Sequence, residues 1–337
     1  MGKVSIIIPM YNVSRYIEKC VRTLFEQTFD DIEYLFVNDA TPDDSIEILK
    51  HLIELYPNRK GQCKIVNHHS NKGLTAARNS GLNVATGDYI IYCDSDDWVE
   101  LTMISDMYNA AIVQDADIVS CDFQMIYKDR NVLYHTVDWT ENKVDSLRNY
   151  IRYEWTVIWN LLVKRKLYTE NGIKFLEGHA YCEDFNASVK LLYFAKKVVY
   201  LRKVLYNYNQ LNANSIMRNL SSKTMNDEQV MYLDVIDFFK RRSAYSDYKK
   251  QLCWRILKSK QEWALDTATY NKFLDFYPES HKYIISCPYL NVKLKIMMWS
   301  LTHRLAVVSR FMLLLRKIRH YKDCLLYTSD AADDSLR

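Results

Sequence analysis

The chain has 337 residues, of which 49% are hydrophobic and 26% are charged, and its 45 Lys and Arg against 41 Asp and Glu give a formal charge of +4 at pH 7. A half-apolar composition with only 7 Gly and 5 Pro excludes disordered, collagen-like and low-complexity chains. The near-neutral charge argues against a dedicated duplex-binding protein, so we expect no nucleic-acid partner.

Compact apolar runs in the amino-terminal part of the chain predict strands, with room for a helix after each. These runs are residues 3–9, 32–38, 63–68 and 88–93. Periodic apolar positions between them predict helices over 14–28, from Pro42 onward, and over about 72–85. Strands that alternate with helices predict an α/β, Rossmann-like fold, a mostly parallel sheet with helices on both faces.

Beyond Trp98 the pattern loosens, and from about 223 to 323 it is typical of helices throughout. We place a boundary near 215, which gives one domain over 1–215 and a helical carboxy-terminal region over 216–323. Residues 324–337 break abruptly from the Lys-, Ile- and Tyr-rich sequence before them. We interpret them as a non-native tail, with a disordered acidic tail as the alternative.

The amino end predicts a cytoplasmic protein. One Lys precedes a short apolar run that Pro9 interrupts, which is too short for a signal-peptide core or a membrane span. The eight cysteines form no CxxC pair and no zinc-finger spacing, which favours reduced thiols.

The strongest chemical signal is Asp94-Ser95-Asp96-Asp97, directly after the fourth predicted strand. Carboxylates held together at a strand end repel one another unless a cation lies between them. Hard oxygen ligands suit Mg²⁺ or Mn²⁺ that bridges to a diphosphate. The alternative is a solvated acidic turn that caps the following helix, because short acidic turns are common.

Other predicted strand ends carry groups suited to a nucleotide, at the edge where parallel sheets bind ligands. Tyr11 offers a ring that can stack on a base. Asp39 can accept a hydrogen bond from a nucleobase or ribose, although it is also placed to cap the following helix. The segment 71–81 begins a helix with Lys72 and Arg78 near the same edge, which favours an anion. Packing explains each group singly, but together they predict a nucleotide-diphosphate site.

With these motifs the chain resembles a family 2 glycosyltransferase of the GT-A fold, a group of inverting sugar transferases. The matching stretches follow the family's order over most of 1–217. They are SIIIPMYN at 5–12, VNDAT at 37–41, NKGLTAARNSG at 71–81, GDYIIYCDSDDW at 87–98, WNLL at 159–162, EGHAYCEDF at 177–185 and YNYNQLNANSIM at 206–217. Two positions depart from the family's pattern: Ala40 stands where Gly is common, and Leu161 where many relatives carry Lys.

The resemblance implies roles for individual residues. Asp96, favoured over Asp97, binds the metal, and Glu183-Asp184 holds the catalytic base, which we assign to Asp184. The implied donor-binding residues are Pro9, Tyr11, Asn12, Asp39, Lys72, Arg78, Asp94, Ser95 and Asp97. The implied acceptor and lid residues are Trp159, Asn160, His179, Tyr208 and Ser215, of which the last two belong to a loop that closes over the donor. From spacing alone, Glu183-Asp184 is an exposed acidic pair before a helix, and a lone His such as His179 is usually structural.

The implied reaction is a single displacement with inversion. An acceptor hydroxyl attacks the anomeric carbon while the nucleoside diphosphate leaves from the opposite face, so a base is needed on one side and charge neutralisation on the other. A divalent cation, Mn²⁺ or Mg²⁺, with Lys72 or Arg78, would stabilise the departing diphosphate. The resemblance implies a UDP-sugar as the nucleotide-sugar donor and a glycan or lipid-linked glycan of a bacterial surface polysaccharide as the acceptor.

Residues 291–323 carry eight Lys and Arg and a single acid, Asp323, interleaved with Met, Trp, Phe and Leu. This composition predicts contact with the anionic inner-membrane surface, in a peripheral position on its cytoplasmic face. Charges interrupt every apolar run, so we expect no membrane span. Packing against the first domain or a second subunit is the alternative, which leaves a homo-oligomer open.

Two other functions stay open. A catalytically inactive glycan- or nucleotide-binding module is opposed by the intact Asp94–Asp97 and Glu183-Asp184, although intact residues do not prove turnover. A sugar-nucleotide nucleotidyltransferase would need a Gly-rich, Arg- and Lys-bearing loop after the first strand, and PMYNVSRY at 9–16 is not such a loop.

Overall fold

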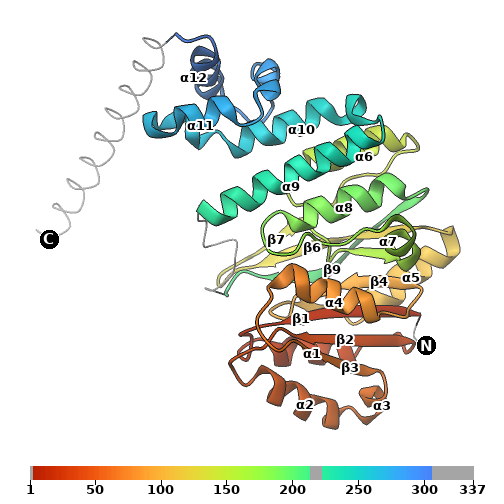
Figure 1. The fold of residues 1–337 in the computed structure, drawn as a ribbon. Coiled ribbons are helices and arrows are strands. Elements are labelled where there is room, and N and C mark those ends of the chain that lie inside the picture. Colours follow the sequence, from red (N-terminus) through yellow and green to blue (C-terminus); the bar gives the residue numbers. More distant parts are fainter. Residues whose placement is uncertain (1–2, 213–221, 306–337) are drawn as a thin grey trace, which may run out of the picture. The chain divides into compact units, whose positions relative to one another are not determined.

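The structure is a computed structural model that describes residues 3–212 and 222–305. The chain divides into two compact units, one ending at Tyr245 and the other beginning at Ser246 (Figure 1). The domain boundary predicted near 215 falls within 213–221, outside the described residues, and it stays a prediction. The segment 324–337 also lies outside them.

A nine-stranded sheet forms the centre of the first unit. Its strands are β1 (Val4–Met10), β2 (Ile32–Asn38), β3 (Cys63–Asn67), β4 (Tyr89–Tyr92), β5 (Trp98–Val99), β6 (Ile118–Ile126), β7 (Asn131–Tyr134), β8 (Leu161–Lys164) and β9 (Val198–Asn209). Their order is β3-β2-β1-β4-β8-β6-β9-β5, and β7 pairs with β6. The strands β1 to β4 pair in parallel, as do β6 and β9, whereas β8 runs antiparallel to both β4 and β6.

The predicted fold class is confirmed. The four apolar runs coincide with β1 to β4 to within a residue at each end, and the sheet is mixed with a parallel core. Every residue of β1 is buried, which is the pattern of a strand covered on both faces. The alternation of strands and helices did not indicate the antiparallel pairings, which join β8 to β4 and β6, β7 to β6, and β5 to β9.

The helices of the first unit pack on this sheet or on one another (Figure 1). They are α1 (Ile17–Phe25), α2 (Ser45–Leu55), α3 (Pro57–Lys60), α4 (Leu74–Val84), α5 (Met103–Gln114), α6 (Lys143–Arg152), α7 (Arg165–Asn171), α8 (Glu183–Phe194) and α9 (Ser222–Arg241). The approach of α4 is close, because a Cβ added at Gly81 would lie 2.4 Å from Cγ2 of Ile7 on β1. Glycine at this position lets α4 lie against β1, and α4 carries Arg78.

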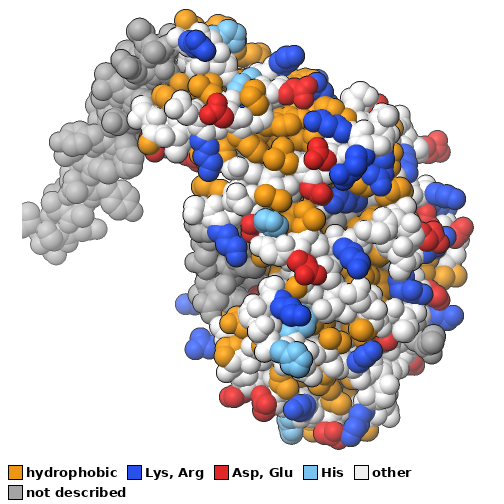
Figure 2. Space-filling view, viewed as in Figure 1, with side chains coloured by type: hydrophobic (Ala, Val, Ile, Leu, Met, Phe, Trp, Pro, Cys, Tyr) orange, Lys and Arg blue, Asp and Glu red, His pale blue; other side chains and the backbone are white. Residues whose placement is uncertain are grey.

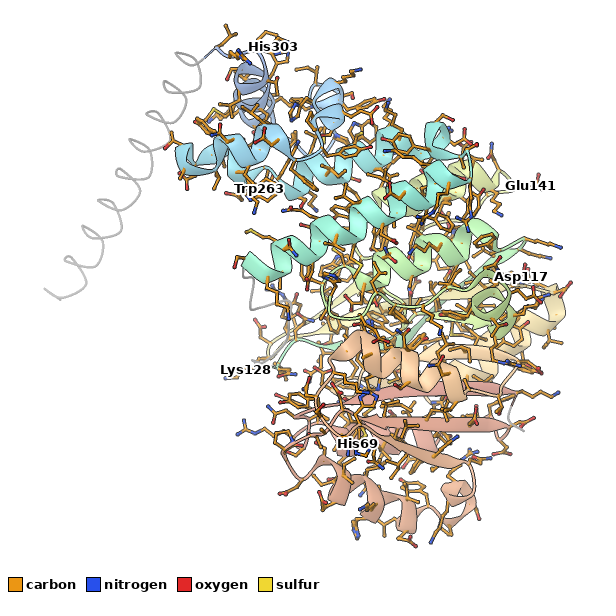
Figure 3. All side chains as sticks on the ribbon, viewed as in Figure 1. His69, Asp117, Lys128, Glu141, Trp263 and His303 are labelled. Carbon is orange, nitrogen blue, oxygen red and sulfur yellow. The ribbon has the colours of Figure 1, made fainter. Side chains whose placement is uncertain are left out.

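The second unit is helical, so the helical carboxy-terminal region expected from the sequence is present. It contains α10 (Tyr245–Ser259), η2 (Glu262–Leu265), η3 (Thr267–Thr269), α11 (Tyr270–Asp275), η4 (Pro278–Tyr283) and α12 (Val292–Thr302), where η marks a 3-10 helix. Its core includes Trp254, Trp263, Phe273 and Met298. On the face shown in Figure 2 this unit displays hydrophobic atoms beside Lys, Arg and His side chains. Trp263 and His303 are labelled on it in Figure 3. Over 3–212 and 222–305, no helix combines the length and apolar character that a membrane span requires.

Candidate active site

The candidate site lies along one edge of the sheet. The loop Asp94–Asp97 connects β4 to β5, Tyr11 follows β1, and Asp39 follows β2. The strands β2 and β4 each pair in parallel with β1, so the carboxyl ends of these three strands lie at the same edge of the sheet. The backbone N–H of Asp39 donates to the carbonyl of Met10 at 3.0 Å, which sets the residues after β1 beside those after β2.

Asp97 fixes the acidic loop to β9. Its buried carboxylate accepts a hydrogen bond from the Tyr206 hydroxyl at 2.7 Å and another from the backbone N–H of Asn209 at 2.7 Å. The same hydroxyl accepts from the backbone N–H of Asp94 at 3.1 Å. Burial, together with the charges of Asp96 and Asp94, raises the pKa of Asp97 well above its ordinary value. Asp97 is therefore engaged in holding the loop.

Asp96 is less enclosed than Asp97. Its Oδ2 accepts from the Asn212 side chain at 2.7 Å, and its backbone carbonyl accepts from the Asn209 side chain at 3.0 Å. Burial and the charge of Asp94 raise the pKa of Asp96. The surroundings thus disfavour the ionised form, and a cation near Asp96 would favour it.

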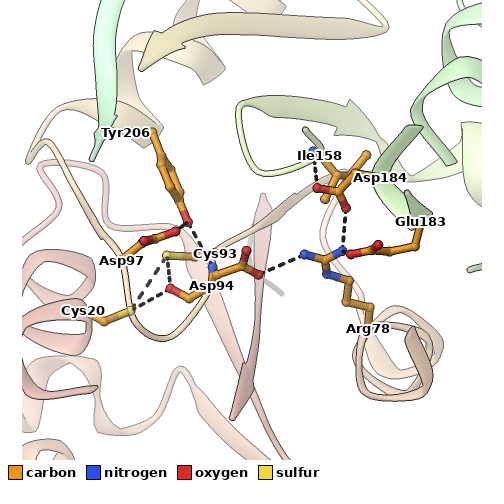
Figure 4. Close-up of polar contacts among 9 residues, drawn as sticks. All are labelled: Cys20, Arg78, Cys93, Asp94, Asp97, Ile158, Glu183, Asp184 and Tyr206. Atoms are coloured by element: carbon orange, nitrogen blue, oxygen red, sulfur yellow. Dashed lines mark hydrogen bonds and ion pairs between the residues drawn. The ribbon is translucent and has the colours of Figure 1, made fainter. Parts of the chain in front are cut away.

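Arg78 links the acidic loop to Glu183 and Asp184, the residues predicted to hold the catalytic base (Figure 4). Its guanidinium, 1% exposed, lies 2.9 Å from Asp94, 3.1 Å from Glu183 and 2.5 Å from Asp184. Burial disfavours the charged guanidinium, but the three carboxylates outweigh it and raise the pKa of Arg78 well above its ordinary value. One positive charge therefore faces three carboxyl groups, and the cluster has a surplus of negative charge when all three are ionised.

Glu183 and Asp184 begin α8, where they form its first turn. The second oxygen of Asp184 accepts from the backbone N–H of Ile158 at 3.2 Å, so this carboxylate is held on both sides. Burial and then the charge of Asp184 raise the pKa of Glu183 to about 7. Burial also raises the pKa of Asp184, although Arg78 opposes that rise. The two carboxyl groups are neighbours with raised pKa values, so they titrate as a coupled pair.

Asp39 is buried, and backbone N–H groups of the loop before α4 donate hydrogen bonds to its carboxylate. It accepts hydrogen bonds from the backbone N–H groups of Lys72 at 2.8 Å and Gly73 at 2.7 Å. Its Oδ1 lies 2.7 Å from Nδ1 of His68, whose Nε2 lies 2.8 Å from the Ser80 hydroxyl. The amides just before α4, which predicted an anion site, thus have Asp39 itself as their anion. The contact of Asp39 with a nucleoside stays a prediction.

The remaining predicted donor residues differ in access. The Tyr11 side chain is 46% exposed and Lys72 is exposed, whereas Pro9 and Ser95 are buried. The N–H of Asn12, whose φ is 55°, donates to the Thr41 hydroxyl at 2.8 Å. Tyr11, Asn12 and Lys72 are therefore the exposed residues of this set.

The predicted acceptor and lid residues fall in three places. Trp159 is buried and stacks on Tyr206, with ring centroids 4.0 Å apart, and its neighbour Asn160 donates to the carbonyl of Cys121 at 3.0 Å. Tyr208 is half-buried, 5.6 Å from the Trp159 ring. His179 lies 2.8 Å from Asp227 on α9, and Ser215 lies outside the described residues. The structure brings Trp159 and Tyr208 to the acidic loop through Tyr206, and their acceptor roles stay predictions.

Sequence reasoning missed the residues that hold these groups in place. Asn209 and Asn212 fix the acidic loop, and the backbone N–H of Ile158 binds the predicted base. His68 supports Asp39. The Asn-rich run at 207–214 was a signal for the first two residues, whereas a backbone donor such as Ile158 leaves no trace in the sequence.

The acidic loop suits a divalent cation that shares its coordination with a ligand. Asp94 and Asp96 offer half-buried carboxylate oxygens, and burial together with the charge of Asp94 raises the pKa of Asp96. Among the described residues, no three His, Cys, Asp or Glu side chains form a complete metal site. Mg²⁺ is commonly held by one or two carboxylates, with substrate phosphates completing the shell, and the residues present fit that arrangement.

Comparisons with known proteins identify the family and the fold of the chain. The family model described as "Glycosyl transferase family 2" matches residues 5–181, a little over half of the chain. The uncharacterized glycosyltransferase EpsJ of Bacillus subtilis is 36% identical over 222 residues. That alignment covers 63% of this chain and 62% of EpsJ, which is less than two thirds of the relative's length.

Solved structures support the fold. The structure of TarS residues 1–349 from S. aureus, in complex with UDP-GlcNAc, has a TM-score of 0.69 at 16% identity and covers 94% of this chain and 91% of that one. A mannosyltransferase from Pyrobaculum calidifontis, in complex with GDP-Man and Mn²⁺, has a TM-score of 0.53 at 15% identity, with 94% and 88% covered. At these identities the likeness establishes the shared fold, which is the GT-A fold predicted from the sequence.

Proposed function

This chain belongs to glycosyl transferase family 2, and from that premise we propose that it moves a sugar from a UDP-sugar to a hydroxyl of a glycan or lipid-linked glycan in surface-polysaccharide synthesis. The observation that carries the proposal is the Arg78 cluster. One buried guanidinium contacts Asp94, in the acidic loop proposed to bind the nucleotide-sugar donor. It also contacts Glu183 and Asp184, which hold the proposed catalytic base. Donor and acceptor chemistry would therefore meet across a single side chain.

The donor nucleotide occupies the ends of β1, β2 and β4 in this proposal. Tyr11 stacks on the base because its exposed ring is free to do so, and Asp39 lines the nucleoside subsite beside it. Lys72 holds Asp39 through its backbone N–H, and in this proposal its exposed ammonium group faces the diphosphate. Pro9, Asn12 and Ser95 shape the backbone of this subsite. The UDP-GlcNAc of TarS and the GDP-Man of the mannosyltransferase are the donors to compare.

Asp184 is the proposed base. It removes the proton from the acceptor hydroxyl as that oxygen attacks the anomeric carbon, and the nucleoside diphosphate leaves from the opposite face with inversion. The N–H of Ile158 and the guanidinium of Arg78 hold the Asp184 carboxylate in one orientation. A divalent cation held by Asp96 and Asp94 would neutralise charge on the departing diphosphate. Arg78 balances part of the charge of Glu183 and Asp184 and favours the ionised form of Asp184.

The acceptor approaches from the Asp184 side. Tyr208 and Trp159 form an aromatic wall that Tyr206 connects to Asp97. Asn160 holds the backbone at Cys121, and His179 contacts the carboxylate of Asp227. Aromatic rings suit the apolar faces of sugars, and closure of a loop over the donor would exclude water that otherwise hydrolyses it. A lipid-linked acceptor would place the enzyme in a peripheral position on the cytoplasmic face of the membrane.

The first experiment needs no acceptor. UDP is titrated calorimetrically into the full chain with and without Mn²⁺, and the titration is repeated on Asp96→Ala and on a control, Asp129→Ala, in an exposed turn. We expect UDP binding to be roughly tenfold or more tighter with Mn²⁺, an advantage that Asp96→Ala loses and Asp129→Ala keeps. Absence of UDP binding under both conditions contradicts the UDP-sugar donor, and GDP and dTDP titrations then separate another donor from an inactive module.

A further inference from the structure

Helix α12 is apolar on two opposite sides. Met298 and Leu301 face the core of the second unit. On the opposite side, Val292 is 71% exposed, Ile296 43% and Trp299 40%. Spacings of four and three residues place these three side chains in one line along the helix. We name this line the α12 stripe: Val292, Ile296 and Trp299.

Cations lie at both margins of the α12 stripe. At 100° per residue, Lys293 and Lys295 fall on either side of the line, and Arg304 follows the end of the helix. Residues 291–305 contain these three cations and no Asp or Glu. At the far end, the His303 ring stacks on the Trp299 ring with centroids 4.1 Å apart, and Figure 3 labels His303 there. The exposed surface of α12 thus combines apolar side chains, an indole and positive charge.

We propose that the α12 stripe lies in the interface of an anionic lipid surface, with Lys293, Lys295 and Arg304 facing the headgroups. A helix that lies on a membrane presents apolar residues to the acyl boundary and cations at the margin, and Trp favours the headgroup level. A helix apolar on both sides leaves one side uncovered in water, and the cationic margin matches an anionic partner by charge.

The proposal is independent of the donor site. It rests on residues of the second unit, whereas donor binding rests on Tyr11, Asp39 and Asp96 in the first. It extends the proposed function, because an enzyme held at a lipid surface meets a lipid-linked acceptor there. UDP titration and vesicle binding therefore fail or succeed separately.

Vesicle co-sedimentation of the full chain tests the proposal. The probes are phosphatidylcholine vesicles and vesicles with about 30% phosphatidylglycerol, at low and at high salt. We expect binding to the anionic vesicles alone, weakened by salt. Ile296→Glu places a charge in the middle of the α12 stripe and lowers the partition coefficient roughly tenfold or more. The matched control is Val113→Glu on α5, at a side chain that is 84% exposed, and it binds as the unchanged protein does.

A second measurement places the stripe at the lipid. Brominated acyl chains quench nearby Trp, so we expect anionic brominated vesicles to quench the unchanged chain more strongly than Trp299→Phe. Both variants keep the thermal unfolding and UDP titration of the unchanged chain. Equal vesicle binding by Ile296→Glu overturns the proposal. So does a dimeric mass in solution that Ile296→Glu reduces to a monomer, because the stripe is then a contact between copies. Lipid binding that depends on the cations of 306–323 alone also overturns it.

Discussion

Two parts of the site hold carboxylates in opposite ways. At the proposed nucleoside end, Asp39 accepts hydrogen bonds from two neutral backbone N–H groups and also contacts His68. At the proposed catalytic end, Asp94, Glu183 and Asp184 share the guanidinium of Arg78. Neutral donors fix a carboxylate without changing the charge around it. A shared cation leaves negative charge in excess, which prepares the cluster to receive a proton or a second cation.

The largest effect is expected from Asp184→Asn. The change keeps the shape of the side chain and removes its basicity, so we expect transfer to fall by roughly 10²–10⁴-fold while UDP binding persists. The control is Asp234→Asn on α9, which removes the carboxylate paired with Lys190 of α8 and leaves the Arg78 cluster intact. Unchanged turnover in Asp184→Asn, measured as UDP release from a UDP-sugar, would remove Asp184 from the mechanism.

The pH dependence of the transfer activity distinguishes Glu183 from Asp184 as the catalytic base. Burial and the charge of Asp184 raise the pKa of Glu183 to about 7. If Asp184 is the base, the acidic limb of the activity profile follows the titration of Asp184 and persists in Glu183→Gln. A limb near pH 7 that disappears in Glu183→Gln would transfer the role to Glu183.

The same raised pKa has a consequence for stability. A carboxyl whose pKa is higher in the folded than in the unfolded chain binds its proton more tightly when folded, so its stabilising contribution is lost as the pH rises toward about 7. We therefore expect the free energy of unfolding of the first unit to fall with rising pH between about 4.5 and 7. Glu183→Gln flattens this dependence. Chemical denaturation at a series of pH values measures it, and an equally steep dependence in the variant contradicts the assignment.

The nucleoside end is tested by Asp39→Asn. An amide in place of the carboxylate has one acceptor oxygen for the backbone donors of Lys72 and Gly73, and its N–H₂ would oppose one of them. Leaving a buried donor unsatisfied costs about 1–3 kcal/mol of stability, and UDP binding should weaken with it. Asp31→Asn, at an exposed position, serves as the control. Full stability and full UDP affinity in Asp39→Asn would show that this carboxylate does not fix the nucleoside end.

These contrasts also show which parts of the site the sequence could predict. The four apolar runs and the polar groups after them predicted the edge where Tyr11, Asp39 and the acidic loop lie, because parallel strands end together. The sequence could not predict the partners of Arg78, because Glu183 is 105 residues away and the contact depends on how closely α4 packs on β1. Ile158 acts through its backbone, which every residue except proline offers.

The smallest effect sharpens the comparison at the nucleoside end. Ala40, directly after Asp39, has a φ of 54°, a left-handed conformation that strains a residue with a Cβ. Ala40→Gly removes that strain but gives the unfolded chain more freedom, so we expect a net gain of roughly 1 kcal/mol in the free energy of unfolding. Ala110→Gly, inside α5, should change stability by a similar amount in the opposite direction, because there glycine only weakens a helix. Thermal unfolding of both variants gives the two signs. Destabilisation by Ala40→Gly would mean that the strain at Ala40 is smaller than the entropy that alanine removes from the unfolded chain.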